Sequence, residues 1–307
     1  MVCEAGGEMM GARESVNAGV LVRKRARTSK TSETAGAQMT FMSALRSEAV
    51  RLRRSPLLWL HAVLALTLGG CAGAYFATTP WDSLLGTDAF FQLIGAGAPL
   101  LAGISCGLAA DAELRAGDAA NLLGVPSRRR TLAAKVVALL VLGLLAAALA
   151  TAVFCGILAS AGRELPAVGA VVLAVAGIAA GSACVYAIFL WVALKLGRNA
   201  SIGAGAFGFG TALALMGGLA NGLVTGTLSG GFGVGLAAIV PFAWPSRLAS
   251  LPLETFIAQA AGAAEQAQAL GLAYATVGAT CLVLTAVVAS VLLVTANRFE
   301  GRHGAGE

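Results

Sequence analysis

Six long apolar segments dominate this chain of 307 residues. A helix rises about 1.5 Å per residue, so about 20 apolar residues cross a hydrocarbon core about 30 Å thick. The segments lack the period-two alternation that a membrane β-barrel requires. We therefore predict an all-α, polytopic membrane protein with six transmembrane helices, at Pro56–Phe76, Ala89–Ala110, Val136–Ala161, Ala167–Leu194, Ser201–Val224 and Gly271–Ala296.

Positive charge is concentrated in alternate loops between these segments. Thirteen lysines and arginines flank the segments on one predicted side, and only Arg163 and Arg247 fall on the other. Cytoplasmic loops carry such an excess, so both termini are predicted to be cytoplasmic. The net charge of +6 then reports topology and contact with anionic lipid, and no nucleic-acid partner is expected. The thirteen are Arg46, Arg51, Arg53, Arg54, Arg115, Arg128, Arg129, Arg130, Lys135, Lys195, Arg198, Arg298 and Arg302.

The N-terminal part of the chain divides into two segments of different character. Residues 1–38 are polar and aperiodic, which predicts a disordered extension; Met39 or Met42 is an alternative start. Residues 40–55 place Phe41, Leu45 and Leu52 at helical spacing among arginines, which predicts a short helix in the membrane interface. We expect a six-span permease domain over residues 39–303 and a short tail at residues 304–307.

No motif indicates an enzyme, a cofactor site or a metal site. Gly203, Gly205 and Gly208 match GxGxxG, but they lie inside a predicted span, where small residues favour close helix contacts. The same interpretation applies to the pairs Gly69/Gly73 and Gly218/Gly222. The six cysteines are scattered, and no GxxxxGK[ST] nucleotide-binding loop occurs. We therefore predict no ATP hydrolysis by this chain itself.

The predicted spans contain essentially no charged residue, and His61 is expected at the interface. Because an intramembrane charge usually persists for function, its absence counts against a proton-coupled or sodium-coupled carrier. No clustered Ser/His/Asp set supports intramembrane hydrolysis either.

Two loops stand out as contact sites. The connection Asp111–Lys135 predicts a short surface helix at Asp111–Leu123, with Asp111 and Glu113 in its first turn and Ser127 as a cap for the third span. The external connection Thr225–Leu270 contains an apolar piece, Ser229–Val240, that is too short to cross and is followed by prolines. This pattern predicts a re-entrant or interfacial element.

The segments SALRSEAVRLRRSPLLWL, DAELRAGDAANLLGVPSRRRTLAAK and ANRFEGR together suggest a family. The second contains an acidic loop closed by Leu-x-x-Pro-x-Arg, from Leu123 to Arg128. Over about residues 40–303 the chain resembles the membrane-spanning permease subunits of type-2 ABC exporters, in particular the lantibiotic self-immunity group. The resemblance implies a multi-pass protein of the bacterial plasma membrane that pairs with a second permease subunit, as a homo- or heterodimer, and with separate ATPase subunits that bind the ATP.

The resemblance also implies roles for the two loops. The loop helix would couple to the ATPase, and the external loop would contact an antimicrobial peptide that is expelled from the membrane. The alternatives are a type-2 ABC permease for a small drug or lipid-linked substrate, and a non-transporting membrane anchor or sensor. The expected coupling residues are Asp111, Glu113, Leu114, Asn121, Leu122 and Leu123, and the expected external gate or substrate residues are Pro241, Trp244, Pro245 and Arg247.

Overall fold

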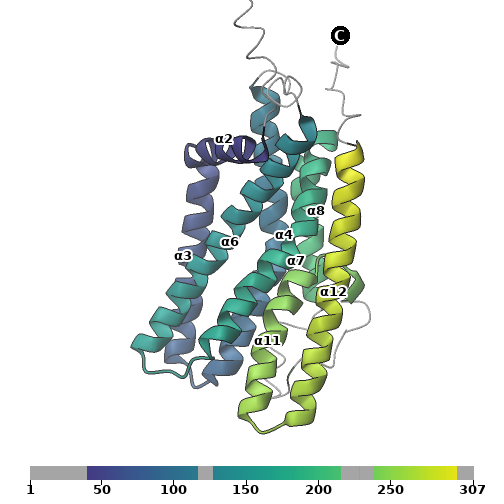
Figure 1. Cartoon of the computed structure of the whole chain (residues 1–307). Coiled ribbons are helices and arrows are strands. Elements are labelled where there is room, and N and C mark those ends of the chain that lie inside the picture. The colour runs from purple at the N-terminus through teal and green to yellow at the C-terminus, as the bar shows by residue number, and fades with distance from the viewer. Residues whose placement is uncertain (1–39, 117–126, 216–227, 229–237, 296–307) are drawn as a thin grey trace, which may run out of the picture. The chain divides into compact units, whose positions relative to one another are not determined.

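The computed structural model describes residues 40–116, 127–215, 228 and 238–295 (Figure 1). The first long helices each start at a capping residue that the sequence makes recognisable. Helix α2 (Phe41–Arg53) precedes α3 (Pro56–Thr78), whose N-cap Ser55 accepts a hydrogen bond from the Leu57 amide. Asp82 caps α4 (Ser83–Arg115), and Ser127 caps α6 (Arg128–Ser160) as predicted. The other described helices are α7 (Val168–Leu196), α8 (Arg198–Leu215), α11 (Trp244–Ala260) and α12 (Ala264–Thr295).

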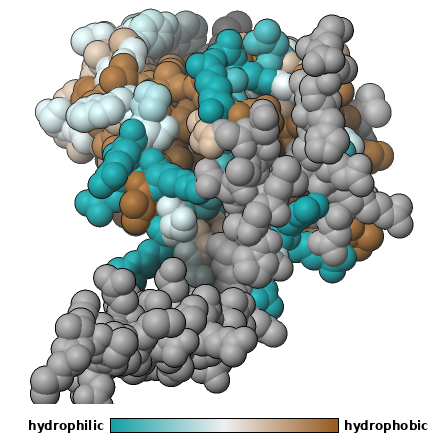
Figure 2. Space-filling view, turned by 90° about the horizontal axis from the view of Figure 1, so that it is seen from above, coloured by the Kyte–Doolittle hydropathy of each residue, from teal (hydrophilic) through white to brown (hydrophobic). Residues whose placement is uncertain are grey.

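The helices form a bundle whose two ends differ in composition (Figure 1). Helix α2 lies across one end, the end at which α6 begins and α4 and α12 finish. We call this end the α2 end; Figure 2 looks onto it and shows hydrophilic residues there beside hydrophobic ones. The turns after α3, α6 and α11 lie at the opposite end. Within the bundle, α3 contacts α6, α4 contacts α8, and α11 contacts α7, α12 and α4.

Five described helices are long and apolar enough to cross a membrane: α3, α4, α6, α7 and α12. Each contains most of one predicted span, which confirms a helical, multi-pass membrane protein. Large apolar side chains such as Trp59, Leu145 and Val283 lie exposed on these helices, as lipid contact requires. The predicted fifth span, Ser201–Val224, overlaps α8 up to Leu215, and its remainder lies outside the described residues.

Small residues bring the helices into close contact, as the glycine pattern predicts. A Cβ atom added at Gly73 would lie 3.1 Å from the Ile157 side chain, which joins α3 to α6. One added at Gly205 would lie 2.9 Å from the Pro99 carbonyl oxygen, which joins α8 to α4. The GxGxxG match therefore serves helix contact, except that Gly203 faces open space, while Gly218 and Gly222 lie outside the described residues.

Candidate functional site

A cluster of four charged residues, three of them buried, fastens α2 to the bundle. Lys135 of α6 donates to Glu48 of α2 and to Glu113 of α4, both at 2.8 Å. Arg51 of α2 bonds Glu113 and lies 3.4 Å from Glu48. The side chains of Lys135, Glu48 and Glu113 are only 5–7% exposed. The two negative and two positive charges balance, which such burial requires. We call this set the α2 cluster.

The residues expected to couple to an ATPase divide into two groups. Helix α4 continues to Arg115, so Asp111, Glu113 and Leu114 belong to its last turns. Glu113 is buried in the α2 cluster, Leu114 packs on the apolar core, and Asp111 pairs with Arg115 at 2.9 Å and Arg198 at 3.4 Å. These three residues therefore fix the bundle end. Asn121, Leu122 and Leu123 lie outside the described residues.

The residues expected at an external gate lie at the start of a buried helix. Helix α11 begins at Trp244, whose side chain is fully buried and donates from Nε1 to the Ala238 carbonyl at 3.0 Å. Pro245 and Arg247 are also buried, and Pro241 is half-buried. A Cβ atom at Gly181 of α7 would meet the Pro245 amide nitrogen at 2.6 Å. Trp244 therefore packs inside the bundle and does not present the outward surface that its sequence context suggested.

A second buried polar set joins α4 to α11. Gln92 of α4 donates from Nε2 to Asp88 Oδ2 at 2.7 Å and to Ser250 Oγ of α11 at 3.3 Å. The Ser250 hydroxyl in turn donates to Glu254 Oε1 at 2.9 Å. Arg247, one turn before Ser250, is 2% exposed, while Asp88 and Glu254 are 4% and 0% exposed. We call Asp88, Gln92, Arg247, Ser250 and Glu254 the gate cluster.

The gate cluster corrects one prediction from the sequence. The second span was expected to begin at Ala89, which left Asp88 outside, but α4 begins at Ser83 and includes it. Glu254 and Arg247 were assigned to an external loop, although α11 packs between the spans. The bundle therefore buries two carboxylates that the predicted spans left out, and the argument against proton coupling, which considered only those spans, does not hold. The signal available in the sequence was polar spacing: Asp88 and Gln92 at i, i+4, and Arg247, Ser250 and Glu254 at i, i+3, i+7.

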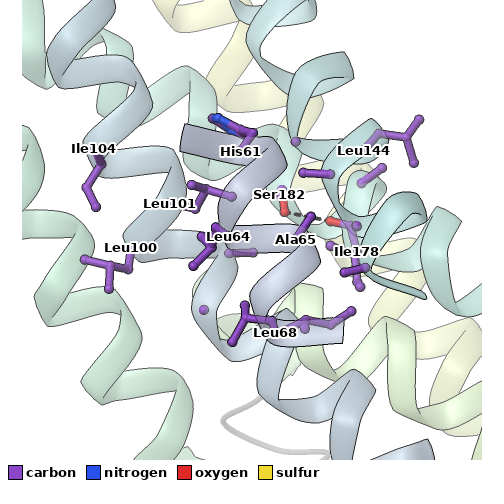
Figure 3. Close-up of a pocket in the computed structure, with 18 of the residues that line it drawn as sticks. His61, Leu64, Ala65, Leu68, Leu100, Leu101, Ile104, Leu144, Ile178 and Ser182 are labelled. Carbon is purple, nitrogen blue, oxygen red and sulfur yellow. Dashed lines mark hydrogen bonds between the residues drawn. The ribbon is translucent and has the colours of Figure 1, made fainter. Parts of the chain in front are cut away.

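An apolar cavity of about 370 Å³ lies between α3, α4, α6 and α7 (Figure 3). Leucine, isoleucine, alanine and glycine make up most of its wall, and few polar groups reach it. The Ser182 hydroxyl in the wall donates to the carbonyl of Ile178 at 2.6 Å, so it is already satisfied. The cavity therefore suits a ligand with an apolar body. Its wall includes Leu64, Leu68, Leu101, Ile104, Leu144, Ala147 and Ile178.

His61 is buried in the wall of this cavity and does not lie at an exposed interface. Its Nδ1 is 2.8 Å from the Leu57 carbonyl, which accepts from a ring N–H, and its Nε2 is 3.4 Å from Ser105 Oγ. With Nδ1 protonated, Nε2 offers a lone pair near the cavity. The residue can therefore accept one hydrogen bond in an otherwise apolar space.

In the part of the chain that the structure describes, no three His, Cys, Asp or Glu side chains group as metal ligands would. No family model, curated protein sequence or solved structure matches this chain.

Proposed function

We propose that this chain is the membrane-spanning permease subunit of an ATP-driven exporter, with its α2 end in the cytoplasm. The observation that carries the proposal is the α2 cluster. It ties α2 to the adjoining ends of α4 and α6, the two helices on either side of residues 117–127. A force applied to that loop by an ATPase would act directly on α4 and α6, which also line the apolar cavity.

The charge distribution supports this orientation. Basic residues gather at the α2 end, whereas Arg163 at the opposite end donates to the carbonyls of Thr79 and Trp81 at 2.8 and 2.6 Å. We propose that the coupling contact is made by Asn121, Leu122 and Leu123, while Asp111, Glu113 and Leu114 hold the end of α4 in the bundle. A second permease copy or a related subunit would complete the transporter.

Co-purification of the full chain with an ATPase subunit that carries the GxxxxGK[ST] motif tests the proposal. The variant Leu122→Asp should abolish this co-purification.

Two cargoes fit such a permease: a lantibiotic-type peptide and a small drug or lipid-linked molecule. The apolar cavity favours the second, because a cationic peptide would find few polar partners in its wall. The burial of Trp244 also removes the aromatic surface that was expected to gather a peptide. We therefore propose a small amphipathic cargo whose apolar body occupies the cavity. A membrane anchor or sensor would need no such cavity.

Filling the cavity should block this cargo. Ala147→Phe on α6 would place a phenyl ring in the cavity. Binding of an environment-sensitive apolar dye to the purified chain in lipid nanodiscs should therefore weaken by about tenfold or more, which requires only a small change in the free energy of binding. The matched control is Ala148→Phe on the same helix, because Ala148 is exposed on the outside of the bundle. Equal dye binding by both variants would mean that the cavity does not hold the ligand.

A further inference from the structure

The gate cluster does not balance its own charge. It holds the carboxyl groups of Asp88 and Glu254 and one guanidinium group, that of Arg247, so it carries one excess negative charge when both acids are ionised. Among the described residues, one charge of each sign acts on Asp88, that of Glu254 and that of Arg247. By contrast, the α2 cluster has two charges of each sign.

No second positive charge comes from the described helices that pack on α11. Helix α11 packs on α4, α7 and α12. The lysine of α7 is Lys195, in the last turn next to the α2 end. The ionisable groups of α12 are the exposed Glu265, the half-buried Tyr274 and the buried Cys281. Residues 216–243 contain no ionisable side chain at all. An isolated charge in an apolar interior is strongly unfavourable, so the cluster must acquire one positive charge from outside.

We propose that the gate cluster is a proton-binding site, in which one proton is held by the carboxyl pair Asp88 and Glu254 and completes the contact of α11 with α4. Asp88 Oδ1 is buried and has no hydrogen-bond partner in the part of the chain that the structure describes. Protonation of Asp88 would therefore remove charge from an oxygen that no hydrogen bond stabilises. Asp88 lies five residues, or about 7 Å, from the start of α4, which is near the end opposite α2.

The hydrogen bonds of the cluster favour a proton over a metal cation. A metal cation needs several oxygen ligands directed at one point. Gln92 directs its Nε2 donor at Asp88 and Ser250, and the Ser250 hydroxyl directs its hydrogen at Glu254. These two polar groups therefore act as donors toward the carboxyl groups. Within the gate cluster, the two acids are therefore the groups that can take up a proton.

Infrared spectroscopy of the full chain in lipid nanodiscs, in sodium-free buffer and with no ATPase present, tests the proposal. The wild type should show the D₂O-sensitive carbonyl stretch of a protonated carboxylic acid at neutral pH. Asp88→Asn and Glu254→Gln should each abolish it, because either substitution balances Arg247 with a single carboxylate. Glu265→Gln, which changes an exposed carboxylate on α12, should leave it unchanged. Arg247→Gln should increase the band, because it removes the compensating charge.

Stability gives a second measurement that needs no variant. The unfolded chain holds no proton on these acids at neutral pH, so the folded state binds one more and loses stability as pH rises. The unfolding equilibrium constant should rise up to tenfold per pH unit over the pH range in which unfolding releases this proton.

Absence of the carboxylic acid band from the wild type at neutral pH would overturn the proposal, as would a band that persists in the Asp88→Asn/Glu254→Gln double variant. A band removed by sodium at constant pH would identify a cation site and overturn it too. Since no ATPase is present, none of these results depends on the exporter assignment.

Discussion

Replacement of Lys135 by methionine is expected to destabilise the folded chain by about 3–5 kcal/mol, the usual cost of removing one partner from a buried ion pair. Lys135 holds two carboxylates at 2.8 Å, and both are almost inaccessible to solvent. Without it, Glu48 and Glu113 share only Arg51, which is 42% exposed, so one negative charge stays buried and unbalanced. Unfolding of the purified chain in mixed micelles by a denaturing detergent measures the loss.

Two further variants separate this charge effect from a general effect of the substitution. Lys195→Met changes the other lysine in the described residues, which lies 5.9 Å from the centre of the Trp191 ring and has no part in the α2 cluster. It should cost far less. Adding Glu48→Gln to Lys135→Met restores a balance of one carboxylate and one guanidinium, and should recover much of the stability. If Lys135→Met were as stable as Lys195→Met, the α2 cluster would not hold α2 in place.

Leu122→Asp should abolish co-purification with the ATPase subunit while the chain still inserts into the membrane. A carboxylate placed in the proposed contact would lose its hydration without gaining a partner. Leu114→Asp cannot make this distinction, because Leu114 packs on the apolar core and its replacement would destabilise the bundle. Affinity purification of the tagged chain, co-expressed with the ATPase subunit, measures the ratio of the two proteins.

Leu196→Asp is the matched control for this experiment. Leu196 ends α7, lies near the α2 end and is 64% exposed, so an aspartate there stays hydrated and outside the proposed coupling segment. The ATPase should co-purify with this variant at the wild-type ratio. Retention of the ATPase by Leu122→Asp would remove residues 111–123 from the coupling mechanism.

Local sequence patterns predicted much of the bundle because span length and helix caps depend on neighbouring residues. The run that begins at Pro56 needs only its own apolar length, and Ser127 needs only the amide of Arg130 three residues later. The helix predicted within residues 40–55 is α2, where the spacing of Phe41, Leu45 and Leu52 was sufficient. The helical conformation of these segments can be predicted from the sequence because neighbouring residues decide it, whereas their packing depends on distant residues.

The two polar clusters could not be predicted in this way, because their partners are far apart in the chain. Lys135 and Glu48 are separated by 87 positions, and Gln92 and Ser250 by 158. In the sequence, Glu254 is one of two acids in a long connection, and only the packing of α11 between the spans makes it a buried charge. Spacing within one helix could mark such residues as a polar face, but it could not say which helix they meet.

The central claim is that the α2 end faces the cytoplasm, where an ATPase can reach residues 117–127. Two single cysteines on α6 test it in an otherwise cysteine-free chain: Arg129→Cys at the α2 end and Ser160→Cys at the other end, both exposed. A membrane-impermeant maleimide should label Ser160→Cys on intact cells and label Arg129→Cys only after the membrane is permeabilised. Labelling of Arg129→Cys on intact cells would place the α2 end outside, and would contradict the exporter assignment.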